Sequence, residues 1–174
     1  MEQTAKQMYN RLMKDNENIR IRVLGDLDDD RIPETLRDIL YKLQAETNRL
    51  CGSSEQSLTL CLAINYGGRR DILNAARKLV EAASTGEVVD IDQFTEEDFS
   101  SLLCTDGLPD PDLIVRTSGE YRLSNFLLWN AAYSELYFTE TLWPDFDHDS
   151  MKKALDWYSL RKRRFGSHES VLDS

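Results

Sequence analysis

The sequence has few cysteines and no long apolar run, and these absences exclude several classes of protein. Its three cysteines, Cys51, Cys61 and Cys104, are far apart and match no zinc-ligand spacing. An odd number does not suggest a closed disulfide framework, so we expect a reduced, cytoplasmic protein. No segment is apolar enough for a signal peptide or a membrane span, so membrane contact would be peripheral and transient.

Positive charge is also scarce. The 21 lysines and arginines are outnumbered by 31 aspartates and glutamates, which gives a formal net charge of -10. A nucleic-acid-binding surface needs an excess of cations, so we exclude nucleic acid as a partner. The cations that remain cluster at residues 20–22, 67–70 and 161–166. An acidic protein can therefore still contain a local site for an anion.

Hydrophobic periodicity predicts strands that alternate with helices. Residues 18–25 alternate apolar and charged side chains, which predicts a half-buried strand, and the apolar run at 58–64 predicts a strand covered on both faces. Helical spacing follows each of these strands, with Pro33 at the expected first helical position and a glycine pair before the second helix. The remaining expectations are an opening helix at 3–15, a capped helix from Thr95, a strand at 113–115, a helix at 124–133, an extended segment at 136–138 and a helix at 147–164 that Gly166 ends.

This alternation predicts an α/β fold with a mostly parallel central sheet flanked by helices and incomplete at its N-terminus. We expect one domain over residues 1–166 and a polar tail over 167–174. In such folds ligands bind beyond the carboxyl ends of the strands. The loops at 65–70 and 116–124 both follow predicted strands, so together they form a candidate site.

The segment RTSGEYRLSN, residues 116–125, carries the strongest chemical signal. Arg116 and Arg122 flank a glycine-containing turn, and Ser124 is one of several hydroxyl side chains nearby. Two guanidinium groups with hydroxyls and exposed backbone amides suit a phosphate or diphosphate, and Ser124 would lie at the positive end of the following helix. The same residue types also fit a loop held by an ion pair between an arginine and Glu120. Composition alone leaves both interpretations open.

Two further features are weaker. Glu135 lies among aromatic residues at the start of a predicted strand, where a carboxylate could help to hold Mg²⁺ against a diphosphate. An exposed edge charge or a structural ion pair with an arginine is the more common role of such a residue. The segment NYGGRRDI, residues 65–72, has two glycines and two arginines, but it matches neither a Walker loop nor the dinucleotide-binding glycine pattern. The glycines alone are weak evidence for a phosphate site, and an ordinary strand-to-helix turn explains the segment better.

In order and spacing, several segments resemble the cis-prenyltransferase family, which includes undecaprenyl diphosphate synthase. They are IRVLGD, the apolar strand leading into NYGGRRDI, the long run PDLIVRTSGEYRLSNFLLWNAAYSELYF, LWPDF, and RRFG near the end. The resemblance extends from Ile19 to Gly166. Asn130 stands where the family more often has glutamine.

The resemblance implies an enzyme that condenses isopentenyl diphosphate with an allylic diphosphate such as farnesyl diphosphate to make a Z-polyprenyl diphosphate such as undecaprenyl diphosphate, using Mg²⁺. It implies that Arg116, Arg122 and Ser124 bind isopentenyl diphosphate and that Glu135 contributes to Mg²⁺ binding. It also implies that Arg164 and Gly166 form a C-terminal motif that reaches the substrate across a homodimer.

One departure from the family pattern limits what these 174 residues are expected to do. The family usually has an MDGNxRW-like segment, whose aspartate holds Mg²⁺, and an FSxENWxR-like segment; neither occurs here. We therefore identify no catalytic residue in this chain. The alternatives are a noncatalytic partner subunit that contributes the C-terminal motif and the dimer interface, or an inactive fragment.

Overall fold

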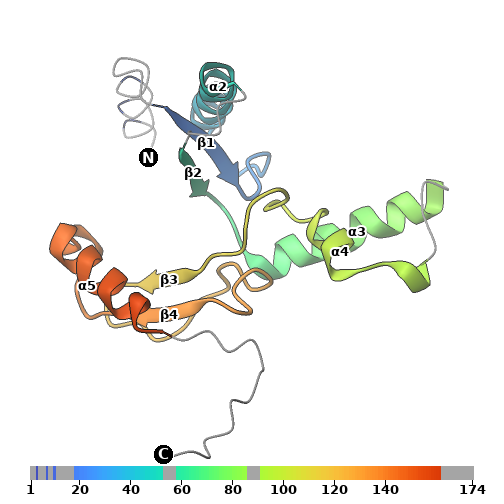
Figure 1. The fold of residues 1–174 in the computed structure, drawn as a ribbon. Helices are drawn as coiled ribbons and strands as arrows, with labels where there is room; N and C mark the ends of the chain where they lie inside the picture. The colour runs from blue at the N-terminus through green and yellow to red at the C-terminus, as the bar shows by residue number, and fades with distance from the viewer. Residues whose placement is uncertain are drawn as a thin grey trace, which may run out of the picture. The chain divides into compact units, whose positions relative to one another are not determined.

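The computed structural model describes residues 18–52, 58–85 and 91–161, together with Gln3, Gln7 and Asn10, which are helical. The chain divides into two compact units, an N-terminal unit of residues 1–106 and a C-terminal unit of residues 107–174. Figure 1 shows the elements of each unit. The opening helix expected at 3–15 falls largely outside the described residues, and one domain over 1–166 stays a prediction.

The N-terminal unit contains a pair of parallel strands with a helix against them (Figure 1). Strand β1 (Ile19–Leu24) pairs in parallel with β2 (Leu58–Ala63), with Ile19 opposite Leu58. Helix α2 (Glu34–Cys51) connects the two strands and packs against β1. Pro33 is the residue before the first helical turn, one position from the expected place. The predicted strand and helix are thus confirmed.

The hydrophobic core of this unit lies between α2 and the strands. Leu36, Leu40 and Leu43 follow one another at helical spacing and are at most 2% exposed. Apolar side chains at this spacing form one stripe along a helix, which is the face that packs on the sheet. Helical spacing predicts that Leu50 belongs to this stripe. The stripe instead ends at Cys51, which is buried, while Leu50 is 46% exposed.

Strand β2 is less covered than its sequence predicts. Leu58 is 65% exposed and Leu60 is 41% exposed, although the run LTLCLAI is typical of a strand buried on both faces. Because alternate side chains of a strand point to the same face, Leu58, Leu60 and Leu62 lie on one face of β2. Within the described residues, Leu62 on β2 packs against the core beside α2, but Leu58 and Leu60 stay accessible. The expectation of a fully covered strand is therefore wrong for this part of the chain.

Helices α3 (Gly68–Thr85) and α4 (Glu96–Ser100), with a short 3₁₀ turn at Ile91–Gln93, complete the N-terminal unit. Thr95 caps α4 as expected: its side chain accepts a hydrogen bond from the Asp98 amide, and the Asp98 carboxylate accepts one from the Thr95 amide. The apolar stripe that helical spacing predicts along α3 is only partly buried. Ala75 is fully buried, whereas Val80 is 69% exposed.

The C-terminal unit contains a second pair of parallel strands and a helix (Figure 1). Strand β3 (Leu113–Arg116) pairs with β4 (Glu135–Phe138), with Leu113 opposite Glu135 and Arg116 opposite Phe138. Beyond a 3₁₀ turn at Trp143–Asp145, helix α5 (His148–Ser159) begins after Asp147, whose side chain accepts a hydrogen bond from the Ser150 amide. Tyr137 of β4 makes an edge-on ring contact with Trp157 of α5.

Two helix predictions in this unit need correction. Residues 124–133 form turns and no helix, because Ser124, Asn125 and Leu127 have φ values of 49°, 67° and 44°, outside the right-handed helical region. Helix α5 ends at Ser159, whereas the sequence predicted helix as far as residue 164. The positive helix end expected at Ser124 is therefore absent.

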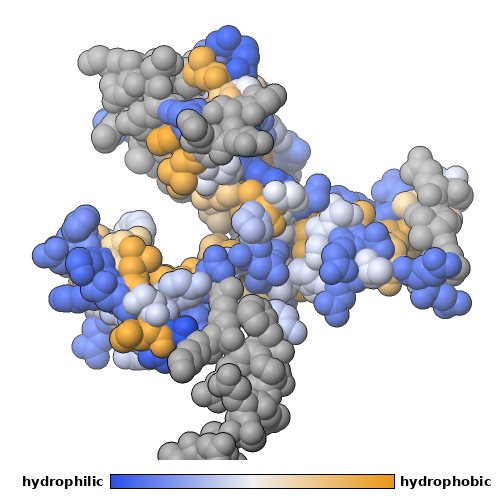
Figure 2. Space-filling view, in the orientation of Figure 1, coloured by the Kyte–Doolittle hydropathy of each residue, from blue (hydrophilic) through white to orange (hydrophobic). Residues whose placement is uncertain are grey.

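The expected α/β class with parallel strands is confirmed. In the described residues the strands form two two-stranded sheets. Within the same residues, no helix combines the length and apolar character that crossing a membrane requires. On the face shown in Figure 2, apolar residues reach the surface in both units between stretches of polar and charged residues.

Candidate functional site

A pocket of about 320 Å³ lies in the C-terminal unit at the carboxyl end of β3. It is lined by Ile114, Val115, Arg116, Thr117, Ser118, Glu120, Arg122, Leu123 and Phe126. The segment RTSGEYRLSN thus bends back on itself and brings both of its arginines to one cavity. That the segment forms a binding loop stays a prediction.

The structure brings Arg116 and Ser124 together. The Arg116 Nη2 donates a long hydrogen bond of 3.5 Å to the Ser124 Oγ. The contact is possible because the loop reverses direction at Ser118 and Gly119, whose φ values are 69° and 67°. Ser124 reaches Arg116 through its own left-handed backbone conformation, which residue types alone do not predict.

Arg122 has a partner inside the same pocket. Its Nη1 forms an ion pair with the Glu120 carboxylate. The two side chains are 66% and 37% exposed, respectively. The ion-pair interpretation of the sequence is therefore correct for Arg122, and the interpretation of the segment as a diphosphate site stays a prediction.

The backbone amides of the loop have a structural role. The Ser118 amide donates to the Thr141 carbonyl at 2.9 Å, and the Gly119 amide donates to the Thr139 carbonyl at 3.0 Å. We expected exposed amides that would bind an anion, and these two are already used. They hold the loop beside the segment after β4, and the positive charge that lines the pocket is that of the Arg116 and Arg122 guanidinium groups.

Glu135 lies away from this pocket. It is the first residue of β4 and stands opposite Leu113, whereas Arg116 is three positions further along β3. Three strand residues span roughly 10 Å. Among the described residues, no group of three acidic, histidine or cysteine side chains is placed to hold a metal ion. The carboxylate that lines the pocket is that of Glu120, and a metal role for Glu135 stays a prediction.

Arg164 and Gly166 lie outside the described residues, so their predicted role stays a prediction. The loop at 65–70, which we expected to share a site with residues 116–124, belongs to the N-terminal unit. Each unit is compact by itself, and the expectation of a shared site is likewise untested.

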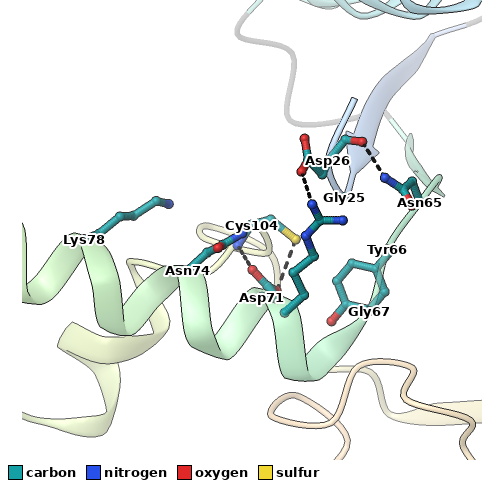
Figure 3. A pocket seen from close by; sticks show the side chains of 10 residues that line it. Gly25, Asp26, Asn65, Tyr66, Gly67, Asp71, Asn74, Lys78 and Cys104 are labelled. Carbon is teal, nitrogen blue, oxygen red and sulfur yellow. Dashed lines mark hydrogen bonds and ion pairs between the residues drawn. The ribbon is translucent and has the colours of Figure 1, made fainter. Parts of the chain in front are cut away.

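The N-terminal unit has a second, polar pocket of about 270 Å³ (Figure 3). Its lining comes from three separate segments: the exit of β1, the loop after β2 with the first three turns of α3, and the loop after α4. The lining residues are Gly25, Asp26, Asn65, Tyr66, Gly67, Arg70, Asp71, Asn74, Lys78 and Cys104. Sequence reasoning found NYGGRRDI but missed its partners, because Asp26 and Cys104 are distant from it along the chain.

An ionic network fixes the exit of β1 beside the start of α3. Arg70 forms ion pairs with Asp26 at 2.8 Å and with Asp29 at 3.3 Å. The side chain and backbone of Arg31 also donate hydrogen bonds to Asp29, and together these donors hold the pKa of the Asp29 carboxyl well below its usual range. The Asn65 side-chain amide adds a 3.0 Å bond to the Asp26 carbonyl. Arg70 is thus used structurally.

The loop after α4 is attached to the same pocket. The Cys104 amide and thiol both donate to the Asp71 carboxylate, at 2.9 and 3.2 Å (Figure 3). Burial, followed by the hydrogen bond to Asp71, raises the pKa of the Cys104 thiol to about 12. Arg22 and Lys78 donate to the carbonyls of Cys104 and Leu102. This cysteine is held as a neutral thiol, unsuited to act as a nucleophile.

Comparison with known proteins gives consistent matches. The family model described as "Putative undecaprenyl diphosphate synthase" matches residues 1–166. An isoprenyl transferase of Aquifex pyrophilus is 47% identical over 155 residues, which is 89% of this chain. A (2E,6E)-farnesyl-diphosphate-specific ditrans,polycis-undecaprenyl-diphosphate synthase of Shewanella oneidensis is 43% identical over 91% of this chain. The chain spans 60% and 55% of the length of these two relatives.

The fold also matches a solved structure. Lavandulyl diphosphate synthase from Lavandula x intermedia, determined in complex with dimethylallyl diphosphate, aligns with a TM-score of 0.85 and 34% sequence identity. The alignment covers 95% of this chain and 68% of the lavender protein.

Proposed function

Because this chain belongs to the prenyltransferase family of undecaprenyl diphosphate synthase, we propose that its C-terminal pocket binds isopentenyl diphosphate for the synthesis of a Z-polyprenyl diphosphate. The proposed reaction joins isopentenyl diphosphate to an allylic diphosphate such as farnesyl diphosphate. A carbon–carbon bond forms, the allylic carbon–oxygen bond breaks to release diphosphate, and a proton leaves the isopentenyl carbon. Isopentenyl diphosphate keeps its own diphosphate throughout, so the pocket has to bind that group rather than expel it.

The convergence of Arg116 and Arg122 on one cavity carries the proposal. Each guanidinium donates to oxygen in a planar, fixed geometry, which suits the paired phosphates of a diphosphate. The Ser124 hydroxyl, already within 3.5 Å of Arg116, would orient that arginine or donate to a phosphate oxygen. Leu123 and Phe126 add apolar surface to the same cavity, as the isopentenyl group requires.

Mg²⁺ belongs to the proposal as the ion that would neutralise diphosphate charge. The described residues do not fit a complete metal centre in this pocket, because Glu135 lies at the opposite end of β3 and β4 from Arg116. A single carboxylate with water and substrate oxygens is a familiar Mg²⁺ environment. Glu135 is the candidate ligand, as the resemblance to the family implies.

The binding proposal is tested by calorimetric titration of the full chain with isopentenyl diphosphate. We expect the double variant Arg116→Ala, Arg122→Ala to lose about a hundredfold or more in affinity, because two charge-assisted contacts are removed. The matched control removes two positive charges from α5, with Lys152→Ala and Lys153→Ala, both exposed side chains of the same unit. Equal affinities for the wild-type chain and the double arginine variant would refute the proposal.

The proposal has three further parts. The chain forms a homodimer, Arg164 and Gly166 contribute to the substrate site across that dimer, and the protein contacts the membrane transiently. Incorporation of labelled isopentenyl diphosphate into an extracted lipid measures the whole reaction, with the chain alone or mixed with a complete family member. Activity that needs the second protein would favour the role of a noncatalytic partner subunit. Activity of the chain alone would favour an independent enzyme.

A further inference from the structure

We infer that Glu120 is an internal counter-ion that occupies Arg122 until the second anionic group of a ligand displaces it, so that Glu120 lowers the affinity of the pocket for a diphosphate and leaves its affinity for a monophosphate unchanged. The inference rests on the proposed function, because it concerns the same pocket. It assigns a specificity-determining role to a carboxylate that the binding proposal does not use.

The geometry of the loop places an acid where an anionic ligand would bind. Glu120 and Arg122 are two residues apart, both line the pocket, and their side chains form an ion pair there. The amides of Ser118 and Gly119, just before Glu120, are fixed by the carbonyls of Thr141 and Thr139. The backbone before Glu120 is therefore anchored, and the carboxylate remains beside the cavity rather than moving away with a mobile loop.

The two arginines of the pocket are not equivalent. Arg116 makes its contact with a neutral hydroxyl, that of Ser124, whereas Arg122 is paired with a carboxylate. An anion that meets Arg116 replaces a weak neutral contact, but an anion that meets Arg122 has to replace a full negative charge. Hydrogen bonds between ionised partners are the stronger kind, so access to Arg122 costs more.

This difference separates ligands by their number of phosphates. A monophosphate satisfies its charge at Arg116 and leaves the pair of Glu120 and Arg122 intact. A diphosphate carries a second group that reaches for Arg122, and it gains that contact only by displacing Glu120. The ion pair has to be broken before the second phosphate can reach Arg122, so Glu120 sets a threshold that the second phosphate has to overcome.

The test compares Glu120→Gln with the wild-type chain, using inorganic diphosphate and inorganic phosphate as calorimetric probes without metal. Because an exposed ion pair contributes little, we expect Glu120→Gln to bind diphosphate about two- to fivefold more tightly. Phosphate affinity should stay within experimental error. Glu140→Gln is the matched control, since it removes the same charge from an exposed residue of the same unit that does not line the pocket.

A double-mutant cycle identifies the partner. In an Arg122→Ala background, Glu120→Gln should no longer tighten diphosphate binding, because the arginine that it releases is gone. Weaker binding of both probes by Glu120→Gln, with its circular dichroism spectrum unchanged, would show that Glu120 only braces the loop and would overturn the inference. Equal tightening of phosphate and diphosphate would also overturn it. A wild-type chain that binds no diphosphate would instead refute the proposed function itself.

Discussion

The two units of this chain are stabilised in different ways. Of the buried apolar side chains in the described residues, ten lie in the N-terminal unit and only Ile114 and Ala154 lie in the C-terminal unit. The N-terminal unit has leucines of α2 packed against parallel strands. The C-terminal unit has loops joined by hydrogen bonds and aromatic contacts, among them the pair of Tyr137 and Trp157.

Under the proposed function, this difference assigns most of the stability to one unit and ligand binding to the other. A hydrophobic core tolerates movement poorly and stabilises a unit in proportion to the apolar area that it buries. A unit that relies on hydrogen-bonded loops presents polar groups to a ligand, but its geometry depends on a few specific contacts. Variants can therefore separate stability in the N-terminal unit from binding in the C-terminal unit.

The largest effect on stability should come from the core of α2. Leu43 is 0% exposed, and Leu43→Ala removes buried methyl groups and leaves a cavity, so we expect a loss of about 3 kcal/mol in the free energy of unfolding. Urea unfolding followed by circular dichroism measures it. The matched control is Leu50→Ala on the same helix, 46% exposed, which should change stability by about 0.5 kcal/mol or less. Equal losses in the two variants would contradict the assigned core.

The next effect should appear in the C-terminal unit, at a polar contact. Asn130 is 6% exposed and donates a 2.8 Å hydrogen bond to Asp110, before β3. Asn130→Ala leaves that carboxylate without this donor, so we expect a loss of about 2 kcal/mol. Because β3 ends in Arg116, the affinity of Asn130→Ala for inorganic diphosphate should fall as well. The affinity of Leu43→Ala, measured at a temperature where that variant is folded, should not fall. Unchanged affinity in Asn130→Ala would break the proposed division between the units.

A smaller effect concerns the pocket of the N-terminal unit. Asp71→Asn removes the carboxylate that helps to raise the pKa of the Cys104 thiol to about 12. The thiol pKa should therefore fall and its alkylation by iodoacetamide should accelerate. Mass spectrometry of peptides from native, briefly labelled protein gives the rate at Cys104, and Cys51, buried in α2, serves as the internal control. A Cys104 rate that is unchanged or slower would contradict the arrangement.

The smallest effect is a pH dependence. The Arg31 contacts lower the pKa of Asp29 in the folded protein, so its stabilising contribution is complete above the unfolded value of about 4 and is lost as the pH falls below it. Asp29→Asn lacks this titration. Urea unfolding near pH 6 and near pH 3 should therefore show a smaller loss on acidification in the variant than in the wild-type chain. Equal losses would contradict the role of the network around Asp29.

The sequence alone predicts the elements that have a clear hydrophobic periodicity or a local capping signal. Strand β1, helix α2 and the capped helix α4 agree with prediction, since alternation, helical spacing and the Thr95 cap are local signals. The helix predicted at 124–133 was wrong because Ser124, Asn125 and Leu127 have left-handed backbone conformations, and Ser124 contacts Arg116 eight residues before it. Intrinsic preferences do not report such contacts.

The candidate site likewise contains features that the sequence predicts and contacts that it does not. The residue types of RTSGEYRLSN predicted that Arg116, Arg122 and Ser124 belong together, and the structure brings both arginines to one pocket. Nothing local indicated that Thr139 and Thr141 would use the loop amides, because these carbonyls belong to a segment that is about twenty residues further along the chain. Residue patterns do not predict contacts between groups that are distant in sequence but adjacent in space.

Gly25 has a consequence for how this sequence can change. Its φ is 114°, and a Cβ placed there would lie 2.2 Å from the Ile64 carbonyl oxygen, where β1 and β2 leave the sheet. That oxygen is backbone, so no rotation of a side chain relieves the clash. Every amino acid that a mutation can introduce at this codon brings a Cβ. Selection would therefore remove such mutations at the level of folding, before any difference in substrate binding could be tested.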